Sequence, residues 1–137
     1  MDGELHSAEV TGAIIGAFYD VYNALGFGFL EGLYLAALER ELVARGHRVG
    51  REVYVPVFYR GAELGRQRLD MVVDESVVVE AKATERLHPI ASRQLFAYLR
   101  ATNLEIGLLL HFGPRPRFHR IVCLNATKPG GRQSRTV

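Results

Sequence analysis

Two acidic residues and one lysine are brought together by a short pattern in the middle of the chain. Glu80 and Lys82 lie two positions apart in the valine-rich stretch 77–82, so their side chains project from the same side of a predicted strand. Asp70 lies in the preceding stretch, 69–73, and the connection 74–76 predicts that the two stretches pair as an antiparallel hairpin. This pairing would bring the carboxylate of Asp70 within reach of Glu80.

Two carboxylates beside an ammonium group suit the hydrolysis of phosphodiester bonds. Carboxylate oxygens are ligands that Mg²⁺ prefers, and the ion keeps several waters when it is bound by one or two of them. The metal lowers the pKa of a bound water, and Lys82 is placed to orient that water or to stabilise the developing negative charge. The alternative is structural, because Glu80 and Lys82 could be a solvated ion pair and a D-x9-E-x-K pattern often arises by chance.

Two features favour the chemical interpretation of these residues. Asp70 and Glu80 are embedded in valine-rich strands, where an unpaired charge is expensive. The basic residues of the chain are almost all arginine, and Lys82 and Lys128 are its only lysines.

The elements that must position these residues follow from the spacing of the apolar side chains. The order of predicted elements is α-α-β-β-β-α-β-β, in which the first three strands form an antiparallel meander and the fourth is a buried central strand. Glu31 lies in the first turn of the second helix. The predicted helices cover residues 11–25, 30–45 (ended by Gly46) and 90–101 (after Pro89), and the predicted strands cover residues 49–59, 63–73, 77–82, 106–112 and 118–124.

Length and composition limit the kind of protein that this chain can be. A chain of 137 residues fits one domain, which we place over residues 1–126, followed by a mobile basic tail over residues 127–137. No apolar run is long enough to cross a bilayer and no secretory signal is recognisable, so we expect a cytoplasmic protein with no membrane partner. The net charge of +2 permits only a local basic face. Cys123, the single cysteine, is expected to be a buried thiol.

Residues 28–34, Gly-Phe-Leu-Glu-Gly-Leu-Tyr, match a known motif in full. In this stretch, and in several further ordered stretches between residues 11 and 124, the chain resembles the GxxExxY proteins, a bacterial and archaeal group placed in the PD-(D/E)xK nuclease superfamily. The resemblance implies an α/β (α+β) fold with a restriction-endonuclease-like core, a mixed sheet flanked by helices. That fold agrees with the element order derived from periodicity.

The resemblance also implies roles for particular residues. Asp70 and Glu80 would bind the metal, Glu31 would be an additional acid and metal ligand from the preceding helix, and Lys82 would be the catalytic lysine. The expected metal is Mg²⁺, with Mn²⁺ as a substitute. Gln94 and Tyr98, four residues apart on one helix, resemble the motif that supports the site in the exonuclease-like branch of the superfamily. Without the resemblance, Glu31 could simply complement the helix dipole.

Other residues near the motifs have a structural and a functional interpretation. Tyr34 is expected to be a packing residue with a hydroxyl handle that supports the site. Arg93 and Arg100 lie seven apart on one helix and are candidates for contacts with nucleic-acid phosphates, although a solvated face is the usual explanation. His111 stands where the family is expected to have asparagine, and we predict a hydrogen-bonded structural histidine there. Leu69 replaces the proline of the superfamily name.

Two functions from different classes remain open on the sequence alone. The first is a magnesium-dependent nuclease that hydrolyses phosphodiester bonds of nucleic acid, with DNA expected over RNA. The second is a non-catalytic nucleic-acid or protein interaction module on a nuclease fold. A core of this size leaves little surface for reading a sequence, so specificity would have to come from a homodimer or a partner protein.

Overall fold

The computed structural model describes residues 2–129, in which three helices and five strands follow one another in the predicted order. Two helices come first, then three strands, one helix, two strands and a short final 3₁₀ turn. The elements are α1 (Asp2–Leu25), α2 (Glu31–Ala44), β1 (Val49–Tyr59), β2 (Ala62–Val73), β3 (Val77–Lys82), α3 (Ile90–Arg100), β4 (Ile106–Phe112), β5 (Pro116–Val122) and η1 (Asn125–Thr127).

The five strands form one mixed sheet in the order β1-β2-β3-β4-β5. The pairs β1–β2, β2–β3 and β4–β5 are antiparallel, as short connections require, whereas β3 and β4 are parallel. The connection between these parallel strands is made through α3, in agreement with the rule that parallel neighbours need a crossover. This arrangement confirms the predicted α+β fold with a restriction-endonuclease-like core.

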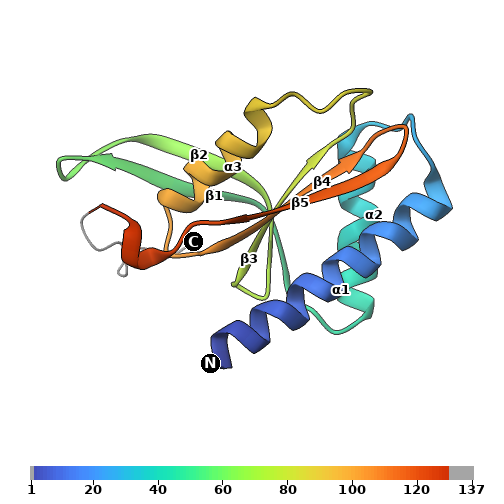
Figure 1. Ribbon diagram of the computed structural model, residues 1–137, viewed down its shortest axis with the longest axis horizontal. Helices are drawn as coiled ribbons and strands as arrows, with labels where there is room; N and C mark the ends of the chain where they lie inside the picture. Colours follow the sequence, from blue (N-terminus) through green and yellow to red (C-terminus); the bar gives the residue numbers. More distant parts are fainter. Residues whose placement is uncertain (1, 130–137) are drawn as a thin grey trace.

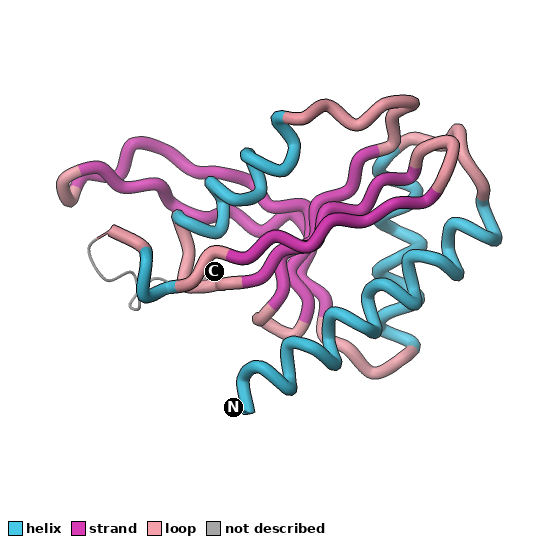
Figure 2. The backbone as a smooth tube through the Cα atoms, in the orientation of Figure 1, coloured by secondary structure: helices cyan, strands magenta, loops and turns pink. Residues whose placement is uncertain are grey.

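Helices cover both faces of the sheet, and each face has its own apolar core (Figure 1). Helices α1 and α2 pack on one face, where Val79 and Ala81 of β3 are fully buried. Helix α3 packs on the other face, where Leu95 and Leu99 contact a second cluster that includes Val78. The tube in Figure 2 shows α3 on one side of the sheet and the pair α1–α2 on the other.

The sequence-based boundaries are wrong at three ends. Helix α1 begins at Asp2 and not near residue 11, and Val10 already packs in the core, 1% exposed. Strand β5 begins at Pro116, two residues early, because an edge strand tolerates proline at its first position. The predicted tail also begins too early, because Lys128 is buried and its Nζ donates hydrogen bonds to Thr102 O and Leu104 O. Residues 130–137 of that predicted tail lie outside the described residues.

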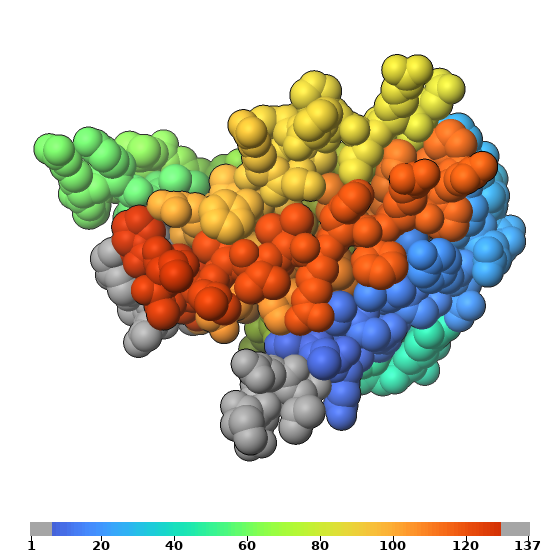
Figure 3. Space-filling view, viewed as in Figure 1, coloured from blue at the N-terminus to red at the C-terminus, as the bar shows by residue number. Residues whose placement is uncertain are grey.

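The hairpin of β1 and β2 projects from the body of the molecule as an arm, green in the space-filling view (Figure 3). Its outer part is exposed on most positions, including Tyr59 and Leu64. Cys123, which directly follows β5, has a free and buried thiol, as predicted. In the part of the chain that the structure describes, no helix is both long and apolar enough to cross a membrane.

Candidate active site

Asp70 and Glu80 lie where β2 and β3 part from one another, and each carboxylate accepts a backbone hydrogen bond from the other strand. The β2–β3 ladder ends at the pair Met71 and Val79, and the next residues in register are Asp70 and Glu80. The backbone N–H of Asp70 donates to Oε1 of Glu80 over 3.1 Å. The backbone N–H of Ala81 donates to Oδ2 of Asp70 over 3.0 Å. Each carboxylate therefore replaces a backbone acceptor of the partner strand at the point where the ladder stops.

These two hydrogen bonds fix carboxylates that are almost removed from water. Asp70 is 8% exposed and Glu80 is 7% exposed. Burying a charged group is costly unless it is paired or hydrogen-bonded, and a backbone N–H compensates only part of that cost. The predicted proximity of Asp70 and Glu80 is confirmed, and the pair forms a rigid set of oxygen donors.

The electrostatics of the pair are dominated by the burial of Glu80. Burial raises the pKa of Glu80 to about 8, and the negative charge of Asp70 and a hydrogen bond between the two carboxyl groups also raise it. The N–H of Asp70 and the positive charge of Lys82 act in the opposite direction. Burial and the neighbouring charge of Asp70 therefore both favour the protonated form of Glu80 in the metal-free protein.

Lys82 and Tyr98 face this carboxylate pair from two different elements. Lys82 follows Glu80 by two positions on β3 and is partly buried, and its charge lowers the pKa of Glu80. Tyr98 lies in α3, and its pKa is raised by burial and then by the charges of Glu80 and Asp70. The strand and the helix therefore bring four of the predicted residues, Asp70, Glu80, Lys82 and Tyr98, to one place.

Glu31 reaches the same place from α2. A small pocket of about 140 Å³ is lined by Glu31 and Asp70 together with Gly32, Leu35, Arg51, Glu52 and Arg68. Glu31 opens α2 because Leu30 has extended backbone angles and the helix begins at the next residue. Glu80 does not line this pocket, so the structure joins Glu31 to the site through Asp70.

Two residues of the pocket were missed by sequence reasoning. Arg68 Nη2 lies 3.8 Å from Oδ1 of Asp70, and its Nη1 lies 3.7 Å from Oε1 of Glu52. Glu52 has a positive φ of 52° and, like Asp70 opposite it, is skipped by the β1–β2 register. The spacing of Arg68 two positions before Asp70 could have signalled a shared side of the strand. Nothing in the sequence signals the left-handed backbone of Glu52.

Tyr34 fixes the joint between α1 and α2 that precedes Glu31. Its hydroxyl donates to Gly26 O over 2.5 Å and accepts from the N–H of Phe29, and its ring stacks on Phe112 with 4.2 Å between centroids. Tyr34 is fully buried. The expectation of a packing residue with a hydroxyl handle is confirmed, and the side chain positions the start of α2 over β4.

The remaining predicted residues lie around the site and not in it. Gln94, Arg93 and Arg100 are exposed on α3, and none of their side chains forms a hydrogen bond or ion pair with residues 2–129. His111 is 5% exposed, and its Nε2 donates to Thr84 O over 2.7 Å. This bond confirms a hydrogen-bonded structural histidine and ties β4 to the segment that follows Lys82.

The donor set fits a divalent cation that is held by two carboxylates. A buried carboxyl group whose ionised form is disfavoured by a neighbouring acid is stabilised as the carboxylate when a hard cation binds to it. Mg²⁺ is commonly held by one or two carboxylates and completed by water. No group of three or more His, Cys, Asp or Glu side chains between residues 7 and 129 is arranged to hold a metal ion. A role for Glu31 as a third ligand therefore remains a prediction.

Comparisons with known proteins place these observations in a family. The sequence model described as the PD-(D/E)XK nuclease superfamily matches residues 8–121. No curated protein matches the chain. The crystal structure of SSO0001 is similar in fold, with a TM-score of 0.54 at 21% identity, and the match covers 69% of this chain. The chain thus corresponds to 50% of the SSO0001 chain.

Proposed function

The chain belongs to the PD-(D/E)XK nuclease superfamily, and from that premise we propose that it is a magnesium-dependent nuclease that cleaves phosphodiester bonds of DNA. The observation that carries the proposal is that the nearly buried carboxylates of Asp70 and Glu80 are each held by a backbone N–H of the opposite strand. A purely structural ion pair would place each acid against a base. Here Asp70 has one long contact with a base, 3.8 Å from Arg68, and Glu80 has no ion pair with the described side chains of residues 7–129.

The residues of the site have separate tasks in this proposal. Asp70 and Glu80 would hold Mg²⁺, or Mn²⁺ in its place, with oxygens that the backbone N–H groups have already oriented. The bound ion would supply Lewis-acid chemistry to the phosphate and lower the pKa of a water. Lys82 would carry a proton on Nζ and stabilise the negative charge that develops on the phosphate. Tyr98 and Gln94 would support the carboxylates and the substrate from α3.

The proposed assignment to the GxxExxY group rests on the structural roles of the three fixed residues of its motif, Gly28, Glu31 and Tyr34. Gly28 has a φ of +125°, a backbone conformation that side chains rarely adopt. Glu31 lines the pocket that also contains Asp70. Tyr34 fastens the loop between them through Gly26 and Phe29. The turn at Gly28 and the hydrogen bonds of Tyr34 together hold Glu31 at the pocket that Asp70 also lines.

The test is a cleavage assay with purified protein on supercoiled plasmid, linear duplex DNA and single-stranded RNA. Each substrate is incubated with Mg²⁺, with Mn²⁺ and with a chelator. We expect cleavage of DNA with either metal and none with the chelator. Glu80→Ala removes a predicted ligand and should abolish cleavage, whereas the matched variant Glu63→Ala removes an exposed acid on the projecting arm and should cleave like the parent.

Two results would overturn the proposal. Cleavage that persists in chelator would exclude a metal-dependent mechanism. Cleavage by Glu80→Ala at the rate of the parent would show that the carboxylate pair is not the site. Cleavage of RNA but not of DNA would support nuclease activity and would contradict the proposed preference for DNA.

A further inference from the structure

A basic cavity lies beside the carboxylate pair, between β5, the connection from β3 to α3 and the first turn of α3. Its volume is about 560 Å³. Figure 3 shows the yellow connection and the orange β4–β5 turn meeting at this end of the molecule. Six of the residues that line the cavity carry a guanidinium or an imidazole group: Arg86, His88, His111, Arg115, Arg117 and His119.

The arginines of this cavity have no partner of opposite charge. The guanidinium groups of Arg86, Arg115 and Arg117 form no hydrogen bond or ion pair with the described side chains, those of residues 7–129, or with the described backbone. The arginines that do form ion pairs lie elsewhere and are paired with acids: Arg45, Arg48, Arg51 and Arg68. Between residues 86 and 124 the sequence has a single acid, Glu105. Positive charge is therefore concentrated here, and Glu85 is the one acid in the lining of the cavity.

Strand register places the cavity in line with the predicted catalytic lysine. Lys82 of β3 is paired with His111 of β4, and His111 is paired with Arg117 of β5. His111 alternates with Leu110 and Phe112, which pack under α1 and α2, so the row Lys82–His111–Arg117 lies on the α3 face. Two strand spacings put Arg117 about 10 Å from Lys82. A separation of this size lets phosphates of one strand contact Lys82 and the cavity at the same time.

The imidazole groups are held in place by the surrounding backbone. Nδ1 of His88 accepts a hydrogen bond from the N–H of Ile90 over 3.1 Å, which leaves the Nε2–H of that ring as a donor. The Nε2 of His111 donates to Thr84 O. Donors and positive charges, with one exposed acid, Glu85, form the polar part of the wall. That chemistry fits an anion with several acceptor oxygens.

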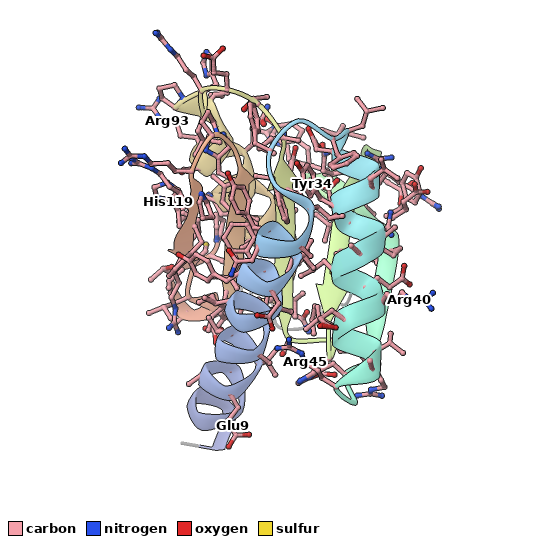
Figure 4. The ribbon with its side chains drawn as sticks, turned by 90° about the vertical axis from the view of Figure 1, so that its right-hand side faces the viewer. Glu9, Tyr34, Arg40, Arg45, Arg93 and His119 are labelled. Carbon is pink, nitrogen blue, oxygen red and sulfur yellow. The ribbon has the colours of Figure 1, made fainter. Side chains whose placement is uncertain are left out.

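We propose that this cavity binds a backbone phosphate of the nucleic-acid strand that Asp70 and Glu80 cleave, close to the cleaved bond. The inference rests on the proposed nuclease function. The cavity would set the distance from a bound phosphate to Lys82 and so hold the strand in register with the carboxylate pair. Figure 4 shows that His119 and Arg93 lie on one side of the molecule, opposite the exposed Arg40 of α2.

The experiment compares two double variants that remove the same charge. Arg115→Gln with Arg117→Gln alters the cavity, and Arg40→Gln with Arg66→Gln alters two exposed arginines that line neither the cavity nor the site. Binding of fluorescently labelled single-stranded and duplex DNA is followed by anisotropy in chelator. The salt concentration is varied from about 50 to about 200 mM, because the loss of affinity over this range depends on the number of phosphate contacts. We expect the cavity variant to bind about tenfold more weakly and to lose about 0.9 from the salt slope on duplex DNA, the value for one phosphate. The control variant should change by less than about twofold.

A second readout does not depend on cleavage. Imidazole proton signals of His88 and His119 are recorded by NMR during titration with the same DNA and, separately, with inorganic phosphate. His47, which pairs with Asp74 at the far end of β2, is the reference. We expect DNA to move the signals of His88 and His119 and to leave that of His47 in place.

The outcomes separate this inference from the proposed function. Equal losses in both double variants, or signals of His88 and His119 that stay unmoved while the parent cleaves DNA, would overturn the cavity and keep the nuclease. A parent that neither binds nor cleaves nucleic acid, but whose His88 and His119 respond to inorganic phosphate, would overturn both in favour of a small phosphate ligand.

Discussion

The two faces of β3 differ although the same six residues form both. Val79 and Ala81 point toward α1 and α2 and are fully buried in an apolar core. Glu80, between them, is 7% exposed on the opposite face, and the partly buried Lys82 follows it there. Burial of Val79 stabilises the fold by removing apolar surface from water. Burial of Glu80 raises its pKa to about 8 and so opposes the ionised form. The face toward α1 and α2 is apolar throughout, whereas the face toward α3 carries the fully buried Val78 and, next to it, an acid in an unfavourable place.

The largest expected difference between the faces is in activity. Glu80→Gln keeps the size of the side chain and should lower the cleavage rate by at least about a thousandfold, because an amide cannot replace the charged ligand. Val79→Ala should leave the rate constant within about twofold and lower the free energy of unfolding by about 2 kcal/mol, through the cavity it leaves. Single-turnover cleavage and urea unfolding of both variants measure the two effects. A loss of activity in Val79→Ala that matches Glu80→Gln would remove the distinction between the faces.

Lys82 tests whether the polar face needs an ammonium group or only a positive charge. Lys82→Ala should reduce the cleavage rate about a hundredfold, because it removes the group that stabilises charge on the phosphate. Lys82→Arg should not restore the rate, since a guanidinium is planar and larger than an ammonium. Cleavage rates at saturating Mg²⁺ decide between them. Near-parental cleavage by Lys82→Arg would show that charge alone is sufficient.

The raised pKa of Glu80 predicts how stability changes with pH in chelator. The folded protein keeps this proton up to about pH 8, whereas the unfolded chain releases it near the ordinary value of 4.5. Between these two pH values the folded state binds more protons than the unfolded chain, so the free energy of unfolding falls as pH rises. The stability linked to the proton on Glu80 is fully present only below about pH 4.5. The melting temperature should therefore fall further between pH 5 and pH 8 for the parent than for Glu80→Gln. Parallel curves would contradict a buried, protonated Glu80.

A smaller effect is expected from relief of the repulsion between the two acids. Asp70→Asn keeps an oxygen that can accept from Ala81 N–H and removes one negative charge, so in chelator it should melt a few degrees above the parent. Mg²⁺ binds only the folded site and should stabilise the parent by about 2.7 kcal/mol at a hundredfold excess over its dissociation constant. The variant should gain little. Equal increases in melting temperature with Mg²⁺ in both proteins would contradict the proposed metal site.

Local patterns in the sequence were sufficient for most of the fold. The alternation over residues 77–82 and the tight connection before it predicted the hairpin, the register that brings Asp70 to Glu80, and the shared face of Glu80 and Lys82. These predictions hold because strand periodicity is a property of neighbouring residues. The order of elements followed from the same periodicities.

Features set by distant contacts could not be predicted in this way. The basic cavity depends on the parallel pairing of β3 with β4, which aligns Lys82 with Arg117 across two strands. Arg68 and Glu52 join the site through the register of β1 with β2. Lys128 looked like part of a polar tail because nothing in its local sequence shows the carbonyl groups of Thr102 and Leu104 that it binds.

The two lysines of the chain have a practical consequence for chemical labelling. Lys128 is 5% exposed, and its amine is engaged by Thr102, Leu104 and Asn125. Lys82 is partly buried beside Glu80. Apart from the α-amino group, an acylating reagent under native conditions therefore finds one accessible amine, at the centre of the carboxylate face. The mass of a single acyl group on the peptide that contains Lys82 reports directly on whether that site is open or covered.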